Sequence, residues 1–180
     1  SVNSVIINVK GAISALLESN CTLEHEHSKV TELDFCCLRL LGDTWSDFLN
    51  FFKQERAHNL EKLTLQSCFL MSRQAPKSLC DILTNEYCPK LKYLDLGGNS
   101  FSHEDLEALC GQRLFNLAEL YLNVCALPYD CTLLISELLT DERCNLTVLS
   151  MKGPFYTTDE NLDAQKLCEA LQNEHCKLRK

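Results

Sequence analysis

Apolar residues recur at fixed offsets in six segments of the chain. Each segment has apolar residues at positions 1, 4 and 6, usually Cys or Asn at position 9, and another apolar residue at position 11. The clearest copies span residues 60–70, 91–101 and 117–127, and weaker copies begin at Val2, Val30 and Leu146. Alternation at positions 4 and 6 predicts a short β-strand with its apolar side chains facing inward. Because each strand has a like strand in the next repeat, we expect them to pair in parallel.

The repeat length leaves room for a helix after each strand. Position 1 falls on Val2, Val30, Leu60, Leu91, Leu117 and Leu146, with spacings of 28, 30, 31, 26 and 29 residues. Such spacing is typical of long repeats whose return limb is helical. Position 9 is expected to turn the chain away from the sheet, because Asn can hydrogen-bond the turn backbone.

Polar caps predict where helices begin. Ser102 precedes Asp105 by three residues, which is the spacing of a capping box, and Thr157 precedes Glu160 in the same way. Another helix is expected to open at residue 43. One face of that helix carries a bulky stripe of Trp45, Phe48, Leu49 and Phe52. We expect this stripe to lie in the core and Phe51, which falls off it, to be exposed.

Three of the helical segments align without gaps. Residues 79–88, 135–144 and 167–176 each end in Asn or Asp, then Glu, one variable residue and Cys. With the repeat pattern from about residue 30 to residue 180, they resemble the leucine-rich repeats of ribonuclease inhibitor and of NOD-like receptor C-terminal domains. The resemblance implies an α/β solenoid, shaped as a horseshoe with a concave parallel β-sheet and convex helices. It also implies a protein-binding module, in the NOD-like receptors a sensor or autoinhibitory part of an innate-immunity protein.

Residues 1–180 are predicted to form a single leucine-rich repeat domain of about six repeats. Leu178 follows Leu146 by 32 residues, where position 1 of the next repeat belongs, and no polar cap precedes Val2. Solenoids normally carry terminal caps that shield the open core. The chain is therefore expected to be a fragment of a longer array or of a multidomain protein.

Outward-facing strand positions form columns across the predicted sheet. Position 3 supplies Ser4, Glu32, Lys62, Tyr93, Glu119 and Val148, and position 5 supplies Ile6, Asp34, Thr64, Asp95, Tyr121 and Ser150. Tyr93 and Tyr121 lie in adjacent repeats, and Tyr is enriched at protein interfaces. The flanking carboxylates suit a partner with a basic surface. We predict that a partner binds the residues of both columns in the second to sixth repeats, from Glu32 to Val148 and from Asp34 to Ser150. The alternative is that these are ordinary solvated strand residues.

Charge and hydropathy narrow the classes of partner. The net charge is −8, and the isoelectric point is near 5.1. Nucleic-acid binders need basic patches, because neutralising phosphates supplies most of their affinity. No apolar run approaches the length of a membrane span. We expect neither nucleic acid nor membrane as a partner.

Twelve cysteines allow two readings of the compartment. Most recur in phase with the repeat, at position 9 or on the helical limbs, as small buried hydrophobic residues would. Reduced cysteines of this kind indicate a cytoplasmic protein. Two glycosylation sequons, beginning at Asn20 and Asn145, favour secretion instead, although this short pattern is common by chance.

Catalytic and metal-binding motifs are weak or absent in the sequence. No nucleophile elbow, phosphate loop or His-Glu-x-x-His occurs, so a non-enzymatic protein without cofactors is expected. His25 and His27 with Cys36 and Cys37 could ligate zinc. However, consecutive cysteines on a strand should point to opposite faces, which weakens that possibility; Cys36 alone is a candidate exposed thiol.

Two rival functions stay open. One is an enzyme regulator of the GTPase-activator type, for which Arg39 or Arg73 could reach a nucleotide site. The other is a metal- or thiol-based redox module.

Overall fold

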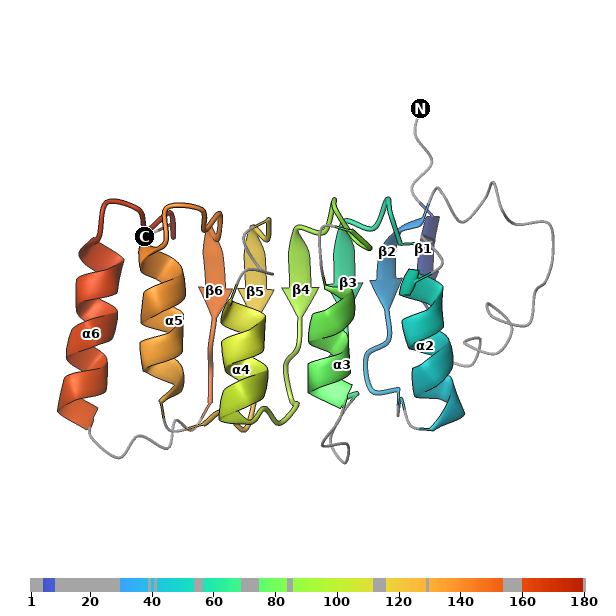
Figure 1. Ribbon diagram of the computed structural model, residues 1–180, viewed down its shortest axis with the longest axis horizontal. Coiled ribbons are helices and arrows are strands. Elements are labelled where there is room, and N and C mark those ends of the chain that lie inside the picture. Colours follow the sequence, from blue (N-terminus) through green and yellow to red (C-terminus); the bar gives the residue numbers. More distant parts are fainter. Residues whose placement is uncertain are drawn as a thin grey trace.

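The computed structural model describes residues 5–8, 30–38, 40, 42–53, 57–68, 75–83, 86–111, 116–128, 130–153 and 160–179. Strands and helices alternate along the chain, and the strands form one six-stranded sheet in sequence order. Figure 1 shows the helices in a row along one face of the sheet. The elements are β1 (Val5–Asn8), β2 (Val30–Asp34), α2 (Asp43–Lys53), β3 (Lys62–Thr64), α3 (Ala75–Ile82), β4 (Tyr93–Asp95), α4 (His103–Cys110), β5 (Glu119–Tyr121), α5 (Cys131–Thr140), β6 (Val148–Ser150) and α6 (Glu160–Gln172).

All strand pairs are parallel, and their register follows the repeat. From β2 to β6 the position-4 residues pair directly: Leu33, Leu63, Leu94, Leu120 and Leu149. The first four of these are 2% exposed or less, and they face the helices as core. The expected parallel α/β architecture is therefore confirmed. We call the opposite face of the sheet, which carries positions 3 and 5, the outer sheet face.

The first strand is placed differently from the sequence prediction. Its Ile7 pairs with Leu33 and its Ile6 with Glu32, whereas the repeat pattern had put Val5 opposite Leu33 and Ile6 opposite Asp34. The structure shifts this copy by two residues, with a register irregularity between Val5 and Ile6. Because side chains alternate with a period of two, a two-residue shift keeps the same faces. The hydrophobic pattern could not distinguish the two registers.

A left-handed turn ends each of the strands β2 to β5. Position 8 has a positive φ in each of these repeats: Cys37 (62°), Ser67 (57°), Gly98 (68°) and Val124 (57°). Its amide donates to the position-7 carbonyl of the following repeat; Cys37 N reaches Gln66 O at 2.8 Å and Ser67 N reaches Gly97 O at 2.8 Å. These hydrogen bonds between the turns of neighbouring repeats hold a conformation that costs most L-residues about 1–2 kcal/mol.

The next residue in each turn, position 9, ties the turn to the preceding repeat. Cys68 Sγ donates to Phe35 O at 2.9 Å, Asn99 Nδ2 donates to Leu65 O at 2.9 Å, and Cys125 Sγ lies 3.2 Å from Leu96 O. Each acceptor is the position-6 carbonyl of the repeat before. This explains why both Cys and Asn serve at position 9, because each supplies a short buried donor.

The helical layer largely matches the predicted caps and stripes. Ser102 and Asp105 form the expected capping box at the start of α4. On α2, Phe48 and Phe52 are buried, and Trp45 and Leu49 pack against them. Thr157, which was expected to cap α6, lies outside the described residues.

The prediction that Phe51 is exposed was wrong. Its side chain is only 6% exposed, and its ring contacts that of Phe52 at 5.7 Å between centroids. On a helix, a residue three positions after Phe48 lies about 60° from it. Phe51 therefore extends the buried stripe of α2 rather than forming a second contact surface.

Candidate protein-binding face

The two predicted columns lie side by side on the outer sheet face. The position-3 column pairs Glu32, Lys62, Tyr93, Glu119 and Val148 across neighbouring strands, and the position-5 column pairs Asp34, Thr64, Asp95, Tyr121 and Ser150. All ten residues are partly exposed, in contrast to the buried position-4 residues of β2 to β5. The structure thus brings together the residues selected from the sequence, while their role in binding stays a prediction.

Tyr93 and Tyr121 form the centre of this face. Their ring centroids are 5.0 Å apart with an interplanar angle of 37°. The ammonium of Lys62 lies 4.6 Å from the centroid of the Tyr93 ring, and Tyr121 Oη donates to Glu119 Oε2 at 2.9 Å. A continuous set of contacts therefore crosses β3, β4 and β5. Such contacts restrict the aromatic rings before any partner arrives, which lowers the entropy cost of binding.

Negative charge surrounds the tyrosine pair. Burial raises the pKa of Tyr93 to about 12, and the carboxylates of Asp95, Glu119 and Asp34 add to the shift along with the Tyr121 phenol. The pKa of Tyr121 is also raised, chiefly by its hydrogen bond to Glu119. Both phenols are therefore neutral over the physiological pH range. Neutral tyrosines beside ionised carboxylates make a surface that attracts cations.

Two acidic residues of the face also have a structural role that the sequence analysis missed. Asp34 Oδ1 accepts a hydrogen bond from the Cys36 amide at 2.9 Å, and Asp95 Oδ1 accepts one from the Gly97 amide at 2.9 Å. These are Asx turns, in which the carboxylate orders the backbone two residues on. The spacing of Asp at position 5 before a turn could have indicated this role. Asp34 and Asp95 therefore contribute charge to the face and order to its edge.

The edge of the face near β6 has one residue that the sequence analysis did not select. Val124 is 68% exposed and adopts a φ of 57°, which is rare for a β-branched residue. Beside it, Asn123 Oδ1 accepts hydrogen bonds from Ser150 Oγ at 2.8 Å and from the Lys152 amide at 2.9 Å. The alignment of Val124 with Gly98 at position 8 was the available signal. An apolar side chain is thus displayed at the rim of the outer sheet face.

Most of the cysteines are packed in the core, as their repeat phasing predicted. The structure describes eleven, all as free thiols, and seven of them are buried. Burial raises the pKa of the Cys110 thiol to about 12 and that of Cys125 to about 11. Cys168 is an exception, because it is exposed on α6 despite matching the phase of buried Cys80. Buried thiols with raised pKa values are poor nucleophiles.

Cys36 and Cys37 depart from the sequence prediction. Their sulfur atoms lie 3.5 Å apart instead of pointing to opposite faces, because β2 ends at Asp34 and both cysteines lie in the following turn, where Cys37 has a left-handed φ. Cys37 is exposed and Cys36 is half-buried. The other two proposed zinc ligands, His25 and His27, lie outside the described residues. Within the described ranges, no group of three or more His, Cys, Asp or Glu side chains could hold a metal ion.

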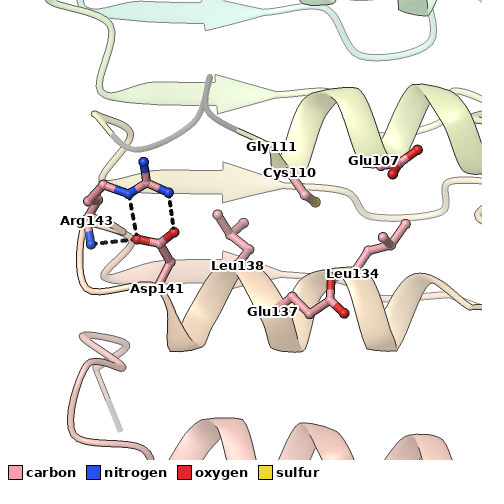
Figure 2. Close-up of a pocket in the computed structure, with 8 residues that line it drawn as sticks. All are labelled: Glu107, Cys110, Gly111, Leu134, Glu137, Leu138, Asp141 and Arg143. Carbon is pink, nitrogen blue, oxygen red and sulfur yellow. Dashed lines mark hydrogen bonds and ion pairs between the residues drawn. The ribbon is translucent and has the colours of Figure 1, made fainter.

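A groove lies on the helical side of the molecule, between α4 and α5. It has a volume of about 220 Å³, and Figure 2 shows Glu107, Glu137 and Cys110 around it with the Asp141–Arg143 pair at one end. Arg143 binds Asp141 through Nε at 2.9 Å and Nη2 at 2.6 Å, which lowers the pKa of Asp141 to about 2. The guanidinium is therefore already engaged by an internal carboxylate. His103 does not line this groove; it is exposed, and its Nδ1 lies 2.6 Å from Asp130 Oδ2.

The arginines considered for a GTPase-activator role, Arg39 and Arg73, lie outside the described residues. In the part of the chain that the structure covers, no helix is long and apolar enough to cross a membrane.

Comparison with known proteins supports the fold. No protein-family model matches the chain, and no curated protein matches it. Among solved structures, the tropomodulin C-terminal domain of Caenorhabditis elegans matches with a TM-score of 0.62. The match covers 92% of this chain and 92% of that chain, at 16% sequence identity. The likeness is one of fold. It supports the repeated α/β architecture with one parallel sheet.

Proposed function

We propose that this protein is an interaction module that binds a partner protein through its outer sheet face. The observation that carries the proposal is the tyrosine pair, Tyr93 with Tyr121, held at 5.0 Å on adjacent central strands. Aromatic residues that are fixed in place and partly exposed are frequent anchors of protein interfaces. Five neighbouring strands at about 4.8 Å spacing extend the two columns over about 20 Å, so the columns would form the centre of a standard interface of about 800 Å² per partner and not the whole of it.

The chemistry of the face favours a partner segment rich in Arg or Lys. The Tyr93 ring already holds one cation, the ammonium of Lys62, at 4.6 Å from its centroid. Carboxylates of Glu32, Asp34, Asp95 and Glu119 lie in the same two columns. A guanidinium can stack on an aromatic ring and bind a carboxylate at the same time. We expect such a partner to associate faster at low salt, because the attraction is screened as ionic strength rises.

Three finer assignments belong to this proposal, and the first two rest on the sequence resemblance. We expect the outer sheet face to be the concave side of a horseshoe. We also expect a role as the sensor or autoinhibitory part of a NOD-like receptor type protein. A cytoplasmic location is expected because seven of the eleven described cysteines are buried as free thiols.

The test is affinity capture of partners from an extract of the source cells, with the purified chain as bait. The double variant Tyr93→Ala with Tyr121→Ala is compared with Lys166→Ala with Gln172→Ala, which changes exposed residues of α6. Captured protein should fall at least about tenfold with the tyrosine variant, the equivalent of about 1.4 kcal/mol. It should be unchanged with the helix variant.

Circular dichroism should show the native spectrum for both variants, so that loss of capture is not loss of fold. Capture with each variant is also measured at low and high salt, where the unaltered chain should bind less at high salt. Loss with the α6 variant and retention with the tyrosine variant would place the binding surface on the helices and refute the proposal.

A further inference from the structure

The turn after β2 holds two thiols close together at the surface. Leu38 N donates to Phe35 O at 3.0 Å, which closes a four-residue turn with Cys36 and Cys37 at its centre. Only Cys37 of this central pair has a positive φ, which is the pattern of a type II turn. The turn is fixed further by the Cys36 amide on Asp34 Oδ1 and the Cys37 amide on Gln66 O. The backbone therefore fixes the two cysteines at adjacent places in an ordered turn, from which their sulfur atoms come within 3.5 Å of each other.

The sulfur separation suits chelation better than a disulfide. Taking a bond from sulfur to a soft acceptor as about 2.3 Å, the length of a zinc–thiolate bond, the 3.5 Å separation corresponds to an S–X–S angle of about 100°. A disulfide instead needs the sulfurs at about 2.05 Å and the Cα atoms at least about 4.4 Å apart. Consecutive Cα atoms are about 3.8 Å apart across a trans peptide. A single larger atom can therefore bridge the two sulfur atoms with less rearrangement than a disulfide between them would need.

We infer that Cys36 and Cys37 form a vicinal-dithiol site that captures a trivalent arsenical, or an equivalent pyramidal thiophilic centre, by two-point attachment. A trivalent arsenic atom forms three bonds, so two sulfur atoms and the one organic group that it already carries complete its coordination. An angle of about 100° also differs strongly from the linear geometry of a two-coordinate soft cation. Zinc would need four donors, and the described residues near the pair supply no third His, Cys, Asp or Glu ligand.

The attachment is a ligand exchange without oxidation. With phenylarsine oxide, two As–S bonds form, and the arsenic–oxygen bond is lost. The two thiol protons leave with that oxygen as one molecule of water. Arsenic stays trivalent and each sulfur keeps its oxidation state, so no oxidant or reductant takes part. The half-buried Cys36 and exposed Cys37 can both be reached from solvent, whereas the seven buried cysteines cannot without local opening.

The experiment treats the folded, reduced protein with one equivalent of phenylarsine oxide and measures its intact mass under native conditions. One phenylarsenic group should be added. A large excess of a monothiol such as 2-mercaptoethanol should leave it in place, and an equimolar dithiol such as 2,3-dimercaptopropanol should remove it, because only a second chelate can match two-point attachment. The variants Cys36→Ser and Cys37→Ser should each lose the adduct in the monothiol wash.

Cys168→Ser is the matched control, because it removes an exposed thiol elsewhere and should retain the adduct. Ser is compatible with the left-handed turn, since Ser67 occupies the same place in the next repeat with a φ of 57°. Circular dichroism verifies that each variant is folded. Retention of the adduct in either single variant, or its loss to the monothiol in the unaltered chain, would overturn the inference. Retention of one equivalent of zinc against a competing chelator, dependent on both cysteines, would also overturn it by assigning the pair to a metal cation.

Discussion

Replacing Asn99 tests how the repeats are joined. This residue is 1% exposed, and its amide donates to Leu65 O at 2.9 Å, Leu96 O at 2.8 Å and Gly97 O at 3.3 Å. In Asn99→Ala the Leu96 carbonyl keeps a donor in Cys125, but the Leu65 carbonyl loses the side-chain donor that Asn99 supplies. Two short hydrogen bonds at about 1 kcal/mol each, plus about 1 kcal/mol for a buried acceptor left open, give an expected loss of about 2–3 kcal/mol.

The assay is urea unfolding followed by circular dichroism. The slope of the unfolding free energy against urea concentration should be the same for all variants, which shows that each exposes the same surface on unfolding. Asn99→Cys should lose about half as much as Asn99→Ala, because Cys68 and Cys125 show that a thiol at position 9 reaches the same carbonyl of the preceding repeat. The exposed Gln172→Ala should change the free energy of unfolding by less than about 0.5 kcal/mol. Equal losses for the Cys and Ala variants, or a loss below about 1 kcal/mol for both, would refute the role assigned to position 9.

Three further predictions concern the sheet and its turns. Leu94→Ala, at a fully buried position, should cost about 2–5 kcal/mol in urea unfolding, while exposed Lys92→Ala should cost under about 0.5 kcal/mol; equal losses would mean that the register is wrong. Gly98→Ala should cost about 1–2 kcal/mol because of its φ of 68°, with an added clash against Ser67 Oγ that Ser67→Ala should relieve. Burial and nearby carboxylates raise the pKa of Tyr93 from 10.0 to about 12, so the native state holds this proton more tightly than the unfolded chain. Stability should therefore fall as the pH rises from about 10 towards 12, and Tyr93→Phe should fall less over that window; an equal fall would exclude Tyr93 as the cause.

The sequence predicted the parallel sheet and its outward columns because both depend on periodicity. Inward Leu63, Leu94 and Leu120 repeat with a fixed offset from position 1, and strand pairing aligns them directly. Once these are aligned, the alternation of side chains places Tyr93 and Tyr121 on the opposite face. The contact between the two rings follows from that register.

Features that depend on individual backbone angles could not be predicted in this way. The assumption that Cys36 and Cys37 continue a strand failed because β2 ends at Asp34 and the chain turns there, with a left-handed φ at Cys37. Gly98, at the same position of a later repeat, was the indication that this site requires such a conformation. The exposure of Cys168 could not be predicted either. Its place in the repeat matches that of buried Cys80, but the repeat pattern does not tell whether another element covers α6.

The turns after the strands have a consequence for how the molecule opens. The amide of Gly98 donates forward to Asn123 O, and the side chain of Asn99 donates backward to Leu65 O. One turn therefore joins its repeat to both neighbours, and a single interior repeat cannot unfold without freeing donors and acceptors on each side. Such coupling makes the array a nearest-neighbour cooperative chain. In a hydrogen-exchange experiment, the amides of a central turn should exchange together with those of the whole repeat around it. Repeats at the ends of the sheet should exchange first.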